Sequence, residues 1–329
     1  MKRPARSLII VFSVFLCLVL VSGCLGEKRQ STADKTYKAI RFGYIMSDQL
    51  HSPAVMVMKE KKLLEAAGIG VEGIEDQTGA YAMTDMMGGS LAFACTGCVP
   101  VISAHAESGG LAIIAGSNQE GSSLVVKEDI KTVADLAGKK IATPGVGSIQ
   151  DLLLEMLAFD NGIKIKNVAM KVSEMPLFLK NGEVDGFLAW APHPTSAAIS
   201  GSGYEILSAG TVLPGYQCCV LSTTENMVRD DPETVRQLMK VYLEAYQWFL
   251  DNMEESIKML SSVTGVAEDV IREAMNTVSY PEAPYCNLDS MQIMTKNLIE
   301  AGKITNVKQP ETEPFLEGLY KPELLNENN

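Results

Sequence analysis

The sequence predicts an α/β protein with mostly parallel sheets, and two observations carry that prediction. Between residues 39 and 221, short apolar runs typical of strands alternate with amphipathic runs typical of helices, and Gly or Pro separates them. Such alternation indicates βαβ units, in which helices pack on the faces of a parallel sheet. From Asp231 the pattern changes to longer amphipathic runs, so we expect an α-helical C-terminal region.

The same patterns predict the bounds of the individual strands and helices. We expect strands at residues 39–44, 70–74, 91–94, 111–115, 123–126, 140–143, 168–172, 184–190, 204–207 and 217–221. We expect helices at residues 55–67, 80–87, 100–107, 132–137, 149–159, 174–179, 195–200, 231–252, 254–262, 267–278 and 288–301. Asp231 is a natural N-cap with Pro232 in the first turn, and Gly302 is a typical C-terminal stop.

Two segments of similar pattern indicate two similar halves. Gly88–Ala94 and Asn181–Phe187 each pass from a helix end through glycine into a buried strand, and a Pro-containing loop follows. Two α/β halves of this plan place the carboxyl ends of their strands opposite each other. The gap between them is where open α/β sheets bind ligands.

The segment Thr143–Ser148 is the main candidate for anion binding. A short strand runs through Pro144-Gly145-Val146-Gly147 into an amphipathic helix, which directs free N–H groups and the positive helix end at one point. Thr143 or Ser148 would add a hydroxyl donor. In the alternative interpretation the glycines only make a tight connection. The segment lacks the Lys of a P-loop and the third Gly of a dinucleotide-binding motif.

The N-terminus is typical of an export signal. A basic start is followed by an apolar run, Leu8–Val21, which is shorter than the ~20 residues that cross a bilayer. Val21-Ser22-Gly23-Cys24 is similar to the lipobox of lipoprotein precursors. We therefore predict a signal peptide at 1–23, a lipid anchor on Cys24, a tether at 24–36 and a location on the extracytoplasmic face of the membrane. The alternative is an ordinary secretory signal in which Cys24 is incidental.

Charge restricts the classes of partner. The formal net charge is −12, which argues against nucleic acid and against anionic membrane surfaces as electrostatic partners. Any bound anion must then be held by local dipoles and hydroxyl groups. We expect no cofactor and a monomeric protein.

The cysteines leave two interpretations open. Cys95, Cys98, Cys218, Cys219 and Cys286 follow the predicted anchor. They are either buried thiols or a structural disulfide, or they include a metal or thiol-ligand site in the cleft, for which Cys95, Cys98 and Cys218 are the candidates. Because neighbouring residues of a strand point to opposite faces, we expect that Cys218 and Cys219 do not serve one ligand.

A family resemblance sharpens this prediction. The lipobox, the opening I-R-F-G-Y with His51-Ser52-Pro53, the D-L-A-G-K-K-I-A segment, G-E-V-D-G and Trp190-Ala191-Pro192 resemble the periplasmic solute-binding proteins of ABC importers. The resemblance is to the nitrate/sulfonate/taurine/bicarbonate branch. It implies the type II periplasmic-binding-protein fold, with two α/β lobes joined by two crossover strands. Its partners are a small anion and the permease and ATPase subunits of a transporter.

By position, the resemblance assigns 37–122 and 216–329 to the first lobe and 123–215 to the second. The ligand-binding residues that it implies are Ser47, His51, Thr78, Gly79, Thr96, Gly97, Gln119, Thr143, Gly147, Ser148, Trp190 and Tyr216. For His51 a surface or capping role is the alternative, and for Trp190 a role in the core. Ala92 and Ala191 stand where relatives often carry acidic residues, which points to an unusual ligand.

Three function classes follow. The first is an extracytoplasmic lipoprotein, not an enzyme, that binds a sulfonate-, nitrate- or bicarbonate-like anion and delivers it to an ABC permease. The second is a cysteine-based receptor for a metal or a thiol ligand. The third is a binding protein or enzyme related to thiamine-pyrimidine synthesis, against which the export signal argues; no Ser/His/Asp triad or carboxylate pair is evident in the sequence.

Overall fold

The computed structural model describes residues 38–75 and 78–326. The predicted signal peptide, Cys24 and the tether lie outside the described residues. Within the described residues the strands form two sheets, one of six strands and one of five. No helix in these ranges is both long enough and apolar enough to span a bilayer.

The six-stranded sheet has the order β11-β4-β10-β3-β1-β2. Its strands are β1 (Lys38–Tyr44), β2 (Ile69–Glu75), β3 (Phe93–Gly97), β4 (Leu111–Glu120), β10 (Gln217–Thr224) and β11 (Val278–Ser279). The pairs β1–β2 and β1–β3 are parallel, whereas β10 runs antiparallel to both β3 and β4.

The five-stranded sheet has the order β7-β6-β8-β5-β9. Its strands are β5 (Ser122–Val126), β6 (Lys140–Thr143), β7 (Lys166–Ala169), β8 (Gly186–Trp190) and β9 (Tyr204–Ser208). β6 pairs in parallel with β7 and β8, and β5 runs antiparallel to β8 and β9. The expectation of mostly parallel sheets is therefore wrong in part. The strands within the βαβ units pair in parallel. β5 and β10, which the chain enters when it passes from one sheet to the other, are antiparallel to their neighbours.

Helices cover both sheets. The α-helices are α1 (Pro53–Glu60), α2 (Leu63–Ala66), α3 (Gly79–Met87), α4 (Cys98–Ser108), α5 (Ile149–Asp160), α6 (Met175–Lys180), α7 (His193–Ile199), α8 (Glu225–Asp230), α9 (Pro232–Asp251), α10 (Met253–Thr264), α11 (Glu268–Met275), α12 (Leu288–Glu300), α13 (Thr312–Leu319) and α14 (Glu323–Asn326). Short 3-10 turns lie at Met46–Asp48, Val133–Leu136, Val172–Glu174, Ala209–Thr211 and Gln309–Glu311. As predicted, Asp231 caps α9 by accepting a hydrogen bond from Thr234 N.

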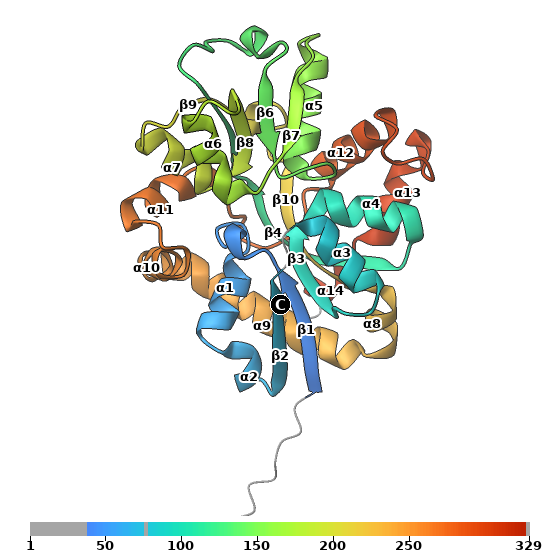
Figure 1. Ribbon diagram of the computed structural model, residues 1–329. Helices are drawn as coiled ribbons and strands as arrows, with labels where there is room; N and C mark the ends of the chain where they lie inside the picture. Colours follow the sequence, from blue (N-terminus) through green and yellow to red (C-terminus); the bar gives the residue numbers. More distant parts are fainter. Residues whose placement is uncertain (1–37, 76–77, 327–329) are drawn as a thin grey trace, which may run out of the picture. The chain divides into compact units, whose positions relative to one another are not determined.

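The chain passes between the sheets twice. It leaves β4 through Gly121 into β5, and it returns from β9 into β10, which lies beside β4 (Figure 1). Tyr216 joins the two passages, because its buried hydroxyl accepts a hydrogen bond from Ser122 N at 3.0 Å. The architecture of two α/β lobes joined by two crossing segments, with helices at the C-terminus, is as predicted.

Several local predictions differ from the structure. The helix predicted at 55–67 is divided between α1 and α2, because Lys62 adopts a left-handed φ of 52°. The sequence has no Gly or Pro at this position that would indicate the break. Residues 117–120, which lie beyond the strand predicted at 111–115, continue β4, and Cys95–Gly97, beyond the strand predicted at 91–94, continue β3. The residues after Met275 leave the helix and form β11 against the end of β4.

Candidate functional site

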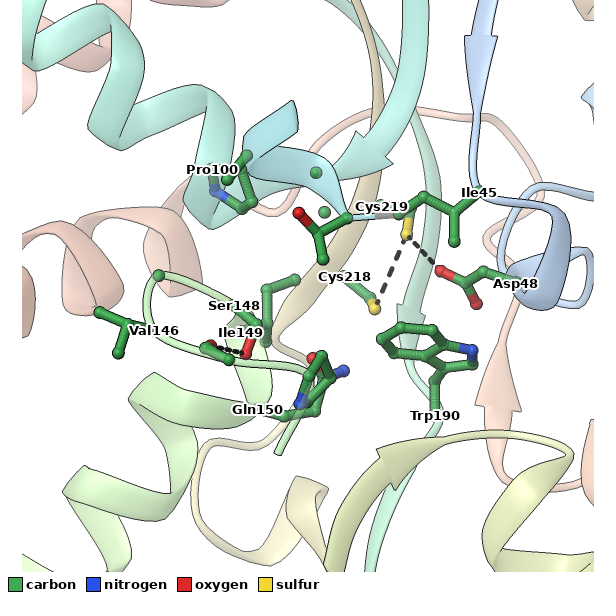
Figure 2. A pocket seen from close by; sticks show the side chains of 17 residues that line it. Ile45, Asp48, Pro100, Val146, Ser148, Ile149, Gln150, Trp190, Cys218 and Cys219 are labelled. Carbon is green, nitrogen blue, oxygen red and sulfur yellow. Dashed lines mark hydrogen bonds between the residues drawn. The ribbon is translucent and has the colours of Figure 1, made fainter. Parts of the chain in front are cut away.

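A cleft with an empty volume of about 510 Å³ lies between the lobes. Its lining comes from both sheets and from the loops at their strand ends (Figure 2). The lining residues are Ile45, Asp48, Thr78, Gly79, Ala80, Gly97, Pro100, Pro144, Gly145, Val146, Gly147, Ser148, Ile149, Gln150, Trp190, Cys218 and Cys219.

The start of α5 forms the wall of the cleft that belongs to the second lobe. β6 ends at Thr143, and the turn that follows needs glycine because Gly145 and Gly147 have φ values of 125° and 83°. Ser148 is the N-cap: its hydroxyl accepts a hydrogen bond from Asp151 N at 3.1 Å and donates one to Gly145 O at 2.8 Å. The Ser148 hydroxyl is thus committed to the helix start.

Asp151 occupies further donors of this turn. Its carboxylate accepts hydrogen bonds from Gly147 N at 3.0 Å and from Asn167 Nδ2 at 2.6 Å, and it pairs with Lys303 Nζ at 2.7 Å. In the first turn of α5, the N–H groups of Ile149 and Gln150 have no acceptor among the described residues. Both residues line the cleft, so the chain offers two backbone donors there at the positive end of a twelve-residue helix.

The opposite wall belongs to the first lobe. Thr78 caps α3, and Gly79 lies against Pro100 so closely that a Cβ would come within 2.7 Å of the proline ring. Gly97 approaches the other lobe, since a Cβ there would lie 3.2 Å from Cδ1 of Ile149. The two walls are therefore in close approach at Gly97 and Ile149.

Trp190, at the end of β8, bridges the lobes. Its indole N–H donates a hydrogen bond to Ser47 O at 2.9 Å, and the ring lines the cleft with 5% of its surface exposed. Trp190 thus both lines the cleft and packs in a buried hydrophobic cluster.

Four polar side chains meet at the base of the cleft. His51 Nδ1 lies 3.0 Å from Asp48 Oδ1 and 3.6 Å from Cys218 Sγ. Cys219 Sγ lies 3.7 Å from Asp48 Oδ2 and 3.9 Å from Cys218 Sγ (Figure 2). All four residues are buried, with at most 4% exposure.

These contacts shift the proton equilibria. Burial alone would lower the pKa of His51, but the Asp48 carboxylate and the Cys218 thiolate outweigh it and raise that pKa to about 10. The hydrogen bond from Cys219 lowers the pKa of Cys218 to about 6 against the cost of burial, and His51 assists. The pKa of Cys219 is raised, because it shares its proton with Cys218 and is buried.

The expectation that Cys218 and Cys219 face apart is wrong. Both thiols line the cleft on one side of β10. The register between β10 and β4 shifts between Gln217 and Val220, and such an irregularity interrupts the alternation of side chains along a strand. The interpretation of His51 as a surface residue is also wrong, because the side chain is fully buried.

The other predicted residues divide into two groups. Those that line the cleft are Thr78, Gly79, Gly97, Gly147, Ser148, Trp190 and Cys218. Those that lie outside its lining are Ser47, His51, Thr96, Gln119, Thr143, Tyr216, Cys95 and Cys98. Three of the second group have clear structural partners: Thr143 Oγ1 donates to Asn167, Cys98 Sγ donates to Gln217 O, and Tyr216 joins the crossing segments. Within the described ranges the five cysteines are free thiols.

Sequence reasoning missed Asp48, Cys219, Ile149 and Gln150. Asp48 precedes His51 by one helical turn, and this spacing was a usable signal for an interacting pair. The described lining contains no Lys or Arg, and Asp48 is its only acidic residue. A bound anion would therefore be held by N–H groups rather than by a basic side chain.

Comparisons with known proteins agree with this architecture. The model of the NMT1-like family matches residues 33–262. The taurine-binding periplasmic protein of Escherichia coli (strain K12) is 24% identical over 230 residues, which cover 66% of this chain and 71% of that protein.

Two solved structures share the fold. The nitrate-binding protein NrtA from Synechocystis PCC 6803 has a TM-score of 0.76 at 16% identity and covers 89% of this chain and 88% of its own. The aliphatic sulphonate-binding protein SsuA from Escherichia coli has a TM-score of 0.70 at 22% identity and covers 83% of this chain and 96% of its own. The chain thus has the periplasmic-binding-protein fold, and it belongs to the NMT1-like family.

Proposed function

We propose that this protein is an extracytoplasmic lipoprotein that binds a small sulfonate-, nitrate- or bicarbonate-like anion between its lobes and delivers it to an ABC permease. The observation that carries the proposal is that the N–H groups of Ile149 and Gln150, at the start of α5, have no acceptor among the described residues, and both residues line the cleft. Helix N-termini bind anions through such groups. Family membership, and relatives named for taurine, sulphonate and nitrate binding, support the same class of ligand.

Binding would be coupled to closure of the lobes. The N–H donors belong to the second lobe, while Thr78, Gly79 and Gly97 belong to the wall of the first. A ligand that contacts both walls favours the closed arrangement over the open one. Trp190 would bound the ligand and would also help to hold the closed arrangement through Ser47.

The first test is a thermal-shift screen of the chain from Gly26 against taurine, alkanesulfonates, nitrate and bicarbonate. A ligand present at about 100 times its Kd adds ~2.7 kcal/mol of stability. A hit among these anions supports the proposal. If none of them stabilises the protein, the assignment to this anion class is wrong.

A backbone substitution tests the donors themselves. Ile149→Pro removes one N–H at the first helical position, where proline is tolerated, and Ser148 already has the extended backbone (ψ 160°) that a residue before proline needs. We expect at least a roughly tenfold loss of anion affinity, because hydrogen bonds to charged groups contribute ~1.5–3 kcal/mol. Ile149→Ala is the control, since it removes the same side chain and keeps the N–H. Equal affinities of the two variants would contradict the role of this donor.

The lipid anchor has a separate test. Cys24→Ser removes the proposed acylation site, so the protein should move from the membrane fraction to the soluble fraction of the cells that export it. Cys286→Ser, which changes a buried thiol in the folded part, should stay with the membrane. If the Cys24→Ser protein also stays with the membrane, it is not anchored through this residue.

A further inference from the structure

The four polar side chains at the base of the cleft have no role in the anion binding proposed above. Asp48, His51, Cys218 and Cys219 come from two distant parts of the chain, and they meet with at most 4% exposure. Three of them, Asp48, Cys218 and Cys219, line the cleft, so the group has a path to solvent through it. Sulfur, imidazole and carboxylate together are the donor set of thiophilic divalent cations, and they differ from the all-oxygen sets of Mg²⁺ and Ca²⁺.

The spacing of the donors fits one ion. The nitrogen of His51 and the sulfurs of Cys218 and Cys219 all lie within 4.8 Å of one another. A tetrahedral Zn²⁺ site with ordinary bond lengths requires donor separations of ~3.8 Å for S–S and ~3.6 Å for S–N. The observed separations are 3.9 Å between the two sulfurs and 3.6 Å between Cys218 Sγ and His51 Nδ1.

Asp48 lies beside these three donors. Its Oδ1 lies 3.0 Å from His51 Nδ1, and its Oδ2 lies 3.7 Å from Cys219 Sγ. Because these distances belong to different oxygens, Asp48 is placed next to the three donors as a nearby negative charge rather than as a fourth member of the group. Two thiolates and one carboxylate would place three negative charges in a buried volume, and a divalent cation offsets two of them.

We propose that His51, Cys218 and Cys219, with the Asp48 carboxylate beside them, form a mononuclear binding site for a thiophilic divalent cation of the Zn²⁺ class at the base of the cleft. The site is separate from the N–H donors of Ile149 and Gln150. The proposal therefore does not depend on the anion, and an anion screen without hits would not affect it.

The test is metal titration of the chain from Gly26, reduced and stripped with a chelator. We expect one equivalent of Zn²⁺ to bind and to raise the melting temperature. Co²⁺ as a probe should give thiolate-to-cobalt charge-transfer absorption and the intense visible bands of tetrahedral cobalt. Absence of stoichiometric binding by either ion would overturn the proposal, as would a Cys218–Cys219 disulfide that persists under reducing conditions.

Variants locate the site. Cys218→Ser, Cys219→Ser and His51→Gln should each lower Zn²⁺ affinity by more than about 100-fold, the upper limit of what changes beyond the ligands cause. Cys286→Ser is the matched control, because it changes a buried thiol elsewhere in the first lobe. If Cys286→Ser binds as weakly as Cys218→Ser, the ion is not bound at this site. Melting curves recorded with chelator present identify any variant that fails to fold. Asp48→Asn then tests the carboxylate beside the site, and a cobalt spectrum of altered intensity is expected.

Discussion

The indole N–H of Trp190, at the end of β8, donates a 2.9 Å hydrogen bond to the carbonyl oxygen of Ser47, in the turn after β1. The two residues are far apart in the sequence, and Ser47 follows a strand of the six-stranded sheet while Trp190 ends a strand of the five-stranded sheet. This bond is therefore a direct link between the lobes across the cleft. Its removal should affect how the lobes close rather than how either lobe folds.

Trp190→Phe keeps an aromatic ring and removes the donor. A neutral hydrogen bond contributes about 1 kcal/mol, so we expect the ratio of closed to open molecules to fall about fivefold. Small-angle scattering of the ligand-free protein should report a larger radius of gyration. Trp248→Phe, on α9 and outside the cleft lining, is the control and should leave the radius unchanged. Identical radii for both variants would contradict the role of the bond.

The close approach of Gly97 and Ile149 gives a second, steric test of lobe closure. A Cβ at Gly97 would lie 3.2 Å from Cδ1 of Ile149, so Gly97→Val should force the two walls apart. With Trp248→Phe as background, Trp190 is the only tryptophan left of the two. Its fluorescence should then be quenched more strongly by acrylamide in the Gly97→Val protein.

The control and the rescue use the same readout. Gly318→Ala adds a methyl group where nothing lies within 4 Å, so its quenching should equal that of the background protein. Combining Gly97→Ala with Ile149→Ala should restore the protection of Trp190, because the second change removes the atom that the new Cβ would meet. If the single Gly97→Ala variant is quenched and the double variant is quenched equally, the contact is not the cause.

The sequence predicted the frame of this cleft better than its base. The Gly145–Ser148 turn and Trp190 were identified because turn glycines, N-caps and strand ends have local signals. Cys219 was missed because the shift of register between β10 and β4 depends on a pairing between distant segments. The role of Ser148 was predicted too simply, because its hydroxyl accepts from Asp151 N and donates to Gly145 O within the chain.

Lys303 is expected to stabilise the start of α5. Its ammonium group pairs with Asp151, whose side chain is 2% exposed, and also with Glu155. Lys303→Met would leave a buried carboxylate without its cation. Breaking a buried pair costs ~3–5 kcal/mol, and because Lys303 itself remains 21% exposed we expect about 2 kcal/mol. The free energy of unfolding in urea measures this loss.

A surface pair gives the comparison for Lys303. Arg236 and Glu233 form an ion pair on α9, where both side chains are exposed. Arg236→Met should leave the free energy of unfolding almost unchanged, because water screens exposed pairs. If the two methionine variants lose equal stability, Asp151 does not depend on Lys303.

His105 should make the fold sensitive to acid. It lies in the last turn of α4, half-buried, and its Nδ1 accepts a 3.1 Å hydrogen bond from Leu111 N, which only the neutral ring can do. Burial lowers the pKa of His105 below its ordinary value of 6.5. The unfolded chain then binds a proton near pH 6.5 that the folded chain binds only at lower pH. The stabilisation is therefore complete above pH 6.5 and is lost as the pH falls through the folded pKa.

The variant His105→Asn isolates this effect. Asparagine offers an oxygen that can accept the Leu111 N–H, and it does not titrate in this range. The free energy of unfolding, measured in urea from pH 8 to pH 5, should fall more steeply for the wild-type protein than for the variant. The difference between the two curves removes the contributions of the other two histidines, which are common to both proteins. A difference that stays constant over this range would show that His105 is as readily protonated in the folded chain as in the unfolded one.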